Sequence, residues 1–412
     1  MVGVPPGRGR WRVMLAERLF DQVRQESPAL VIAEIDARSR RLEQTIDQPS
    51  TFTFTLDGHA PGALQIHELE HEIRLWRWDD DTGQDQEMMR GVIVSSQDTL
   101  SEQRHTVTFT ATDALGILSR RWTTLPLNIL QGEQDAIVGL LVNHATASMQ
   151  TSGGFAFGLG AALPLVLAPL DPGGTPRGPS GRLRDRNYVE GTNVLEALGN
   201  LSNVIDGFDF DTRPVLGSDF ETNDPLRVFY PDKGRLIDGW ALEWGSTVAS
   251  LTRYVSSDTF ANYVRVIGQA DEEVEDAPQL YGEAWLSDAG DIIANPAGVW
   301  MSSLSAADVT VQDTLIEQAA GTLQSSVLVP SYSLVVKPGV YSPQTLDIGD
   351  TVRLRIESGR LDVDTWVRVV GRNFDIGDDG EENVEIQVTR PVPTFSGLFT
   401  DSDQRLGALE RR

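Results

Sequence analysis

The chain has 412 residues, 40% of them hydrophobic and 23% charged, which is enough for two to four folded domains with hydrophobic cores. Its 60 acidic and 34 basic residues give a net charge of −26, which argues against specific nucleic-acid binding but suits a conduit through which DNA slides. The chain has no cysteine, so disulfides and thiolate metal sites are excluded. It has no long apolar run, so a membrane span is not expected. Its basic start lacks an apolar core, so a secretory signal is not expected either.

The first part of the chain is predicted to form a tube-like β module over residues 1–124. Apolar and polar residues alternate in several short segments, and this period of two is typical of strands with one buried face. For residues 11–26 the pattern leaves a short amphipathic helix and an extended segment open, and residues 38–41 are predicted to form a charged turn. The expected strands are Val31–Ile35, Thr51–Leu56, Glu72–Trp78, Arg90–Ser95 and Arg104–Thr112.

Residues 125–247 are predicted to form an α+β middle domain. Apolar residues at helical spacing predict helices at Glu133–Ala147 and Thr192–Val204, the second with Thr192 or Asn193 as its N-cap. Between them, residues 152–182 form a Gly/Pro-rich apolar loop without a charge from Gly153 to Leu170. A mobile loop or a hairpin against a neighbouring subunit is expected there, with an apolar plug or membrane-touching loop as the alternative. Short strands are expected at Gly207–Thr212, Leu226–Tyr230 and Trp240–Trp244.

Residues 248–395 are predicted to form a second tube-like β module with a helical insertion, followed by a C-terminal tail, residues 396–412, that is either loose or a docking peptide. The insertion contains an amphipathic helix within Ala306–Gln324. The expected strands are Asn262–Gly268, Val327–Val336, Thr351–Glu357, Thr365–Phe374 and Asn383–Arg390. The predicted fold class is therefore mainly β, with two tube-like antiparallel β-barrel modules that flank an inserted α+β domain.

The strongest candidate for catalysis is His67–His71, which matches the pattern H-E-x-x-H. On a helix, His67 and His71 would share one face and bind zinc, and Glu68 would activate the metal-bound water. However, Glu72–Trp78 directly afterwards has a strand pattern, and no other histidine falls in a third-ligand motif; these are His59, His105 and His144. We expect an acidic connector between strands, with a zinc-dependent peptidase as the alternative function.

Two acidic segments resemble fragments of calcium-binding loops, at Asp79–Gly83 and Asp375–Gly380. Both lack the full ligand series and lie between expected strands, so they are predicted to be hairpin turns. The tryptophans are expected to be core or interface anchors, with a glycan-binding surface as the alternative; those considered are Trp76, Trp78, Trp122, Trp240, Trp244, Trp285 and Trp366. No catalytic, cofactor-binding or metal-binding residue is assigned, and no cofactor is expected.

The order of these segments resembles that of phage tail-tip hub proteins, also called baseplate hub or minor tail proteins, over about residues 30–392. Asp258–Gly268 is the string most similar to the family, in which such a strand opens the second barrel. The other segments that carry the resemblance are Ser50–Leu56, Ile66–Trp78, Arg90–Val94, Val107–Ile117, Arg120–Trp122, Asn193–Leu201, Gly207–Thr212, Leu226–Pro231 and Trp240–Leu251.

The resemblance implies a non-enzymatic structural protein at the distal end of the virion tail. In such hubs, two tube-like barrels per subunit give a homotrimer a pseudo-sixfold ring that docks on a hexameric ring. The implied partners are a distal tail or tail tube ring protein, the tape measure protein, and tail fibre or tip proteins. The implied mechanism is mechanical: the ring closes the tube, adapts its symmetry and lets DNA pass through the lumen without specific binding.

Overall fold

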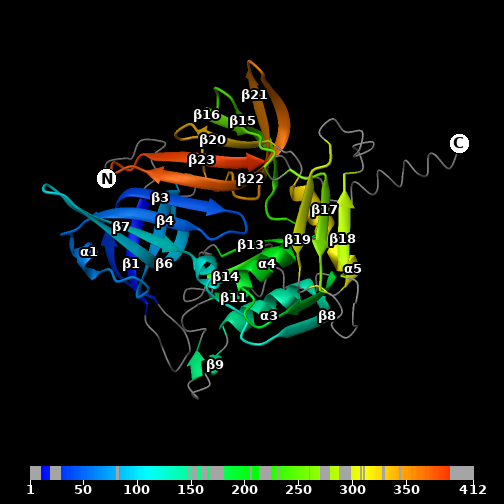
Figure 1. Cartoon of the computed structure of the whole chain (residues 1–412). Helices are drawn as coiled ribbons and strands as arrows, with labels where there is room; N and C mark the ends of the chain where they lie inside the picture. Colours follow the sequence, from blue (N-terminus) through cyan, green and yellow to red (C-terminus); the bar gives the residue numbers. More distant parts are fainter. Residues whose placement is uncertain are drawn as a thin grey trace.

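The computed structural model shows a mainly β protein with two smaller α+β parts at one side (Figure 1). The helices that it describes are too short or too polar to cross a membrane. Most of the loop at 152–182, the residues 80–82 and the C-terminal tail at 396–412 lie outside the described residues. The described residues are 11–18, 29–79, 83–146, 148–150, 156–158, 165–167, 181–204, 207–212, 224–230, 232–258, 260–269, 279–286, 298–306, 309, 311–326, 330–342 and 345–389.

The first β module consists of seven antiparallel strands in the order β3-β4-β7-β6-β5-β1-β2. The alternation in β4 explains its orientation, because Phe52, Phe54 and Leu56 are buried while the intervening threonines are half-buried. The strands are β1 (Trp11–Arg18), β2 (Ala29–Ile35), β3 (Arg38–Thr45), β4 (Thr51–Asp57), β5 (His71–Asp79), β6 (Gln84–Leu100) and β7 (His105–Thr112), with the short helices α1 (Pro61–Gln65) and α2 (Ala114–Leu118).

This module also shows where local patterns were insufficient. Residues 11–18 form a strand, so of the two alternatives for the start of the chain the extended segment is correct here and the amphipathic helix is not. The predicted turn at 38–41 is wrong, because these residues begin β3, a strand whose early positions are polar and mostly exposed. Its place between two partner strands, rather than its own pattern, makes it extended.

The second β module has the strand order β16-β20-β23-β22-β21-β15. All of its neighbouring strands are antiparallel except β15 and β21, which are parallel. β15 belongs to this sheet although it lies within the expected middle domain, because it pairs with β21. The strands are β15 (Leu236–Glu243), β16 (Val248–Tyr254), β20 (Ser331–Val336), β21 (Thr351–Ser358), β22 (Leu361–Ile376) and β23 (Glu382–Thr389).

The two modules form one continuous 13-stranded sheet within the described residues, and this sheet does not close into two barrels. The long strand β22 is the reason. Along one edge its first half pairs with β21 and its second half pairs with β3, while β23 pairs along the other edge. The edge of β3 that a closed first barrel would require is therefore occupied by β22. The predicted mainly β class is confirmed, but the prediction of two closed barrels is not.

The middle region packs its two helices against short strands and has its own core, which includes Leu141, Leu198 and Phe210, and to which α2 also contributes. The helix predictions are confirmed, and Asn193 caps α4 by accepting a hydrogen bond from the amide of Glu196 at 3.1 Å. The elements are β8 (Leu127–Glu133), α3 (Gln134–Thr146), β9 (Ser148–Gln150), β10 (Ala156–Gly158), β11 (Leu165–Leu167), β12 (Leu183–Tyr188), α4 (Val194–Ser202), β13 (Asp209–Asp211) and β14 (Asp224–Phe229).

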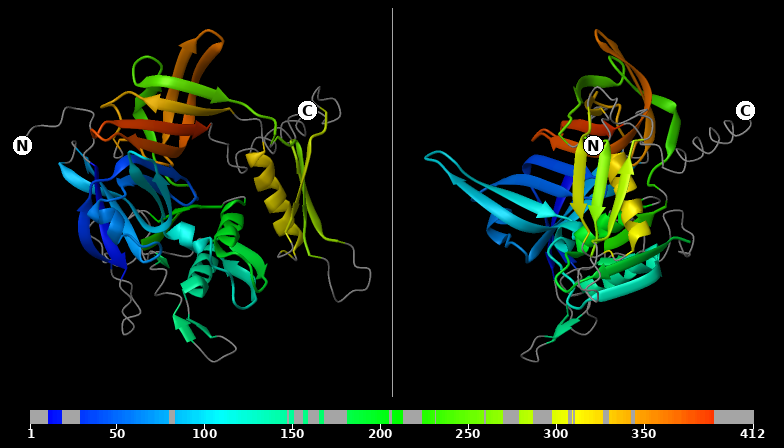
Figure 2. Two further views of the ribbon diagram at one scale, coloured as in Figure 1. Left: turned by 60° about the vertical axis from the view of Figure 1, so that its left-hand side comes forward. Right: turned by 45° about the vertical axis from the view of Figure 1, so that its right-hand side comes forward.

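A separate three-stranded sheet with one helix stands at the side of the molecule, with the helix on its inner face (Figure 2). It consists of β17 (Tyr263–Ile267), β18 (Tyr281–Trp285), β19 (Met301–Ser305) and α5 (Gln312–Ser325). The expectation that the strand at 262–268 opens the second β module is wrong, because β17 pairs with β18 and β19 instead. The helix backbone packs directly on Gly282, where an added Cβ would lie 2.2 Å from a backbone atom of Leu315.

Candidate functional site

The His67–His71 segment does not form the helix that zinc binding would require. Residues 68–70 form a turn in which Leu69 has a φ of 68°, and β5 begins at His71. The imidazole of His71 is buried, and its Nδ1 accepts a hydrogen bond from the amide of His67 at 3.1 Å. Glu68 accepts a hydrogen bond from the hydroxyl of Ser96, which lowers the pKa of Glu68. The predicted acidic connector between strands is confirmed.

Of the two acidic segments, residues 80–82 of the first lie outside the described residues, and the second ends a strand and enters a hairpin. Asp375 and Ile376 are the last part of the β22 strand, and Gly380 adopts a φ of 81° in the hairpin before β23. Among the residues that the structure describes, no group of three or more His, Asp or Glu side chains is placed to hold a metal ion.

The junction between the two β modules is the most unusual site, because it buries charges that sequence reasoning did not single out. Glu382 at the start of β23 accepts hydrogen bonds from both the Nε and Nη2 atoms of Arg77, at 3.0 and 2.6 Å. It also accepts one from Trp11 Nε1 at 2.9 Å. All three side chains are buried, at 6–7% exposure. We call these three residues, together with Phe374, the module seam.

Phe374 of β22 is the apolar member of the module seam. It is fully buried, and its ring lies 5.2 Å from the Trp11 ring and 5.7 Å from the Tyr341 ring, both edge to face. Such pairs contribute about 0.5–1.5 kcal/mol beyond the area that they bury. The seam therefore joins the N-terminal strand of the first module to the last strands of the second module.

A second buried cation, Arg372, lies beside the module seam and is only 1% exposed. Its Nε donates to Gln44 at 2.9 Å, and its Nη1 donates to the Tyr341 hydroxyl at 2.8 Å and to Asp347 at 3.1 Å. Gln44 in turn donates to the carbonyl of Met88 at 3.1 Å. Because buried charges are costly to leave unpaired, this network fixes the register of β22 on β3.

A third cluster joins both β modules to the middle region. Asp47, in the turn after β3, accepts a hydrogen bond from the amide of Phe210 at 2.7 Å. Asp209 of β13 pairs with Arg368 of β22 and accepts from the amide of Lys233 at 2.5 Å. Burial raises the pKa of both aspartates, and we assign the ionised form to Asp209 because it holds the arginine.

Replacing Asp47 by asparagine is expected to make stability less dependent on pH. Burial and then the charge of Asp209 raise the pKa of Asp47 to about 8, whereas an unfolded aspartate titrates at about 3.9. Between these values the folded chain holds a proton that the unfolded chain has lost, so the stability from this group is full below about pH 4 and decreases as the pH rises toward 8. Asparagine keeps the acceptor for Phe210 and tolerates the φ of 57°.

The measurement is the melting temperature of the wild type and of Asp47→Asn between about pH 5 and about pH 8. The difference should increase in favour of the variant as the pH rises, and the contribution of Asp113, whose pKa burial raises to about 6, cancels because both proteins carry it. A difference that does not change with pH would mean that Asp47 is ionised throughout.

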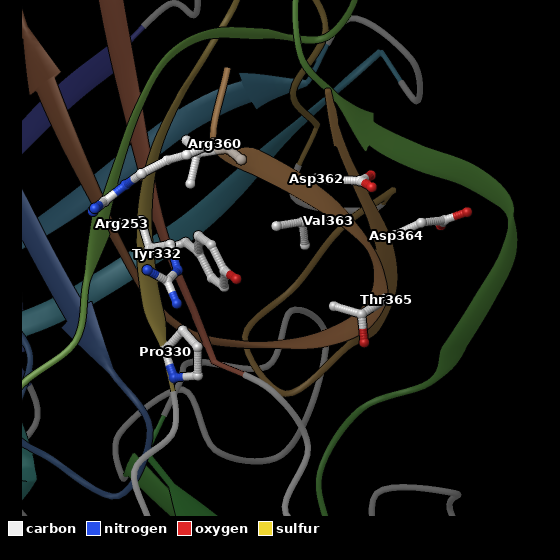
Figure 3. Close-up of a pocket in the computed structure, with 9 residues that line it drawn as sticks. Arg253, Pro330, Tyr332, Arg360, Asp362, Val363, Asp364 and Thr365 are labelled. Carbon is white, nitrogen blue, oxygen red and sulfur yellow. The ribbon is translucent and has the colours of Figure 1, made fainter. Parts of the chain in front are cut away.

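A groove with a volume of about 540 Å³ opens at the outer end of the second β module. Figure 3 shows Arg253 and Arg360 at one side and Asp362 and Asp364 at the other. The other lining residues are Pro330, Tyr332, Leu361, Val363 and Thr365. The groove lies between β20 and the first half of β22.

The tryptophans are spread over several elements. Trp240 packs against the main core, whereas Trp122, Trp244 and Trp285 are about half exposed and lie after α2, after β15 and on β18. Trp300, which the sequence interpretation did not consider, is also exposed.

No protein-family model and no curated protein sequence matches the chain. Solved structures of tail proteins do match its fold. The 43 kDa tail protein of prophage MuSo2 from Shewanella oneidensis is 13% identical with a TM-score of 0.58, and 93% of this chain covers 99% of that one. The tail protein from Neisseria meningitidis MC58 is 12% identical with a TM-score of 0.55, over 92% of this chain and 96% of that one.

The prophage tail protein gp18 from Listeria monocytogenes EGD-e is 10% identical, with a TM-score of 0.52 over 96% of this chain and 99% of that one. At such low identity the likeness concerns the fold, and it extends over nearly the whole of each chain. The chain therefore has the fold of phage tail proteins, as its resemblance to the tail-tip hub family predicts.

Proposed function

We propose that the chain is a non-enzymatic structural hub at the distal end of a phage tail or tail-like particle, where three copies form a ring that closes the tail tube. The observation that carries the proposal is the edge-to-edge joining of two β modules through β3 and β22, in a chain with a tail-protein fold. Two modules fixed side by side in each of three copies supply six similar positions, which suits contact with a hexameric ring.

The proposed mechanism follows from rigidity and charge. The module seam and the Arg372 network hold the two modules in one register, so that force on one module reaches the other. The net charge of −26 disfavours adhesion of DNA phosphates, which suits passage of DNA through the lumen. The proposed partners are a distal tail or tail tube ring protein, the tape measure protein, and tail fibre or tip proteins.

The proposed units are residues 1–124, residues 125–247 and residues 248–395, with the tail at 396–412. In this arrangement β15 crosses from the middle unit into the second β module, and the sheet of β17, β18 and β19 is an insertion into that module. The Asp47 cluster then lies where all three units meet.

The proposal is tested by native mass spectrometry of the full chain, which reports subunit number and bound metal together. A trimer of about 136 kDa, three times 45.2 kDa, is the expected species. Its abundance should increase with protein concentration. A chain that stays at 45.2 kDa at every concentration, also when a tail tube ring protein is added, would contradict the ring. A monomer with one bound zinc ion would favour the peptidase.

A further inference from the structure

The groove at the outer end of the second β module carries more free positive than negative charge. Arg253 of β16 and Arg360 of the β21–β22 turn are exposed on one wall, and neither makes an ion pair within the described part of the chain. On the other wall, Asp364 already accepts hydrogen bonds from Arg353 at 2.6 and 2.7 Å. Asp362 remains as the lining acid without such a pair among the described residues. The groove therefore offers two unpaired cations against one unpaired anion, on a chain whose net charge is −26.

The opposite end of β22 carries the complementary charge. The turn between β22 and β23 exposes Asp379 and Glu381, and neither makes an ion pair with a described residue. Of the two nearby arginines, Arg41 pairs with Glu43 at 2.6 Å, and Arg40 is half-buried and donates to a backbone carbonyl of the turn at 2.6 Å. This end of the strand therefore presents exposed carboxylates to a partner.

The complementary charges at the two ends of β22 cannot neutralise each other within one chain. β22 has 16 residues, which corresponds to a contour of about 50 Å, and it is held in place by pairing with β21, β3 and β23. In Figure 1 the β21–β22 hairpin lies at the top of the second β module and the β22–β23 turn lies at its left side. Two different, complementary patches on one rigid body are what a head-to-tail contact between identical chains requires.

We propose that the groove of one copy binds the β22–β23 turn of the next copy, so that Arg253 and Arg360 hold Asp379 and Glu381 of that neighbour. This contact rests on the proposed ring and joins its copies. Arginine presents a planar fork of donors that matches a carboxylate, so carboxylates are the ligands that such a groove prefers. Because the two patches differ, the contact is heterologous, and three such contacts close a ring when each rotates the next copy by a third of a turn.

Charge also favours a second copy over DNA as the occupant of the groove. Chains with a net charge of −26 each repel one another, and a contact that places arginines on a neighbour's carboxylates offsets this repulsion where the chains meet. Duplex DNA has one negative charge per about 1.7 Å of its axis, so its backbone would meet Asp362 and Asp364 together with the arginines. The groove therefore suits a small acidic turn better than a continuous phosphate backbone.

The first test reverses charges in the full chain and follows trimer formation by native mass spectrometry over a concentration series. Arg253→Glu with Arg360→Glu should raise the concentration at which half of the chains are trimeric by about tenfold or more, because four like charges then meet at each contact. Adding Asp379→Arg and Glu381→Arg to that variant should restore assembly to within about threefold of the wild type, because the same pairs form with their signs exchanged.

The matched control is Arg104→Glu with Arg120→Glu, which changes the net charge by the same amount at two exposed arginines that do not line the groove. It should assemble to within about threefold of the wild type. If the groove variant assembles as well as this control, the ring stands and the contact is refuted. A chain that forms no trimer at any concentration, also with a tail tube ring protein present, contradicts both the ring and the contact.

The second test uses cross-linking through introduced cysteines, because the chain has none of its own. An arginine–carboxylate pair keeps its backbones farther apart than a disulfide can span, so Arg360→Cys with Glu381→Cys is joined by a short bismaleimide. Each chain then has one site for either neighbour, and the expected product is a covalent trimer of about 136 kDa, three times 45.2 kDa. Either single substitution, as the control, can link no more than two chains. A double variant that also stops at two chains, or that links within one chain, would overturn the head-to-tail contact.

Discussion

Replacing Glu382 by alanine is expected to lower the free energy of unfolding by about 3–5 kcal/mol, because it leaves a buried cation without its partner. The Arg77 guanidinium loses both of its hydrogen bonds to the carboxylate, and the indole N–H of Trp11 loses its acceptor. In the wild type, burial works to lower the pKa of Arg77, but the hydrogen bonds to Glu382 and its charge outweigh this and raise the pKa. The variant loses these interactions, yet an arginine is not deprotonated in proteins, so Arg77 remains charged there without its partner.

The measurement is chemical unfolding followed by tryptophan fluorescence. The control is Glu381→Ala, which removes the neighbouring carboxylate from an exposed position and should change the free energy by no more than about 0.5 kcal/mol. Glu382→Gln removes the charge and keeps nearly the same shape, and its amide oxygen can still accept the hydrogen bond from Trp11 Nε1. Equal stability of Glu382→Ala and Glu381→Ala would mean that the pair contributes nothing to the joining of the modules.

Local patterns were sufficient for most of the strands and helices. Strands such as β4 and β21 follow from strict alternation, and α4 follows from helical spacing together with the cap at Asn193. The failure at β3 has a physical reason: positions 38–41 contain no apolar residue to alternate, and the strand exists because β4 and β22 pair along its two edges. Such pairing cannot be deduced from seven or eight residues.

The module seam could not be predicted from the sequence for a related reason. Arg77 and Glu382 are 305 positions apart, and each by itself has the pattern of a polar strand residue. In β22 the register shifts between Val369 and Gly371, so Arg372 and Phe374 face the interior together with Val367. Gly371 within a strand pattern was the one local signal for such a bulge.

The second large effect is expected for Phe374→Ala, which should lower the free energy of unfolding by about 3–5 kcal/mol through loss of buried area and the cavity that remains. Phe374 is fully buried against Trp11 and Tyr341, so neighbouring rings cannot collapse into the space without moving a strand. Phe374→Leu keeps most of the volume and should lose much less. The exposed control Leu100→Ala, at a side chain that is 78% accessible, should lose no more than about 0.5 kcal/mol.

The double variant Phe374→Ala with Glu382→Ala tests whether the seam acts as one unit. Both residues contact Trp11, one through the ring and one through the indole N–H, so removal of the first should leave Trp11 free to shift away from the second. The combined loss should therefore be smaller than the sum of the single losses by about 0.5–3 kcal/mol. If the losses add to within about 0.5 kcal/mol, the two halves of the seam stabilise the chain independently, and a rigid link between the β modules must rest on the Arg372 network instead.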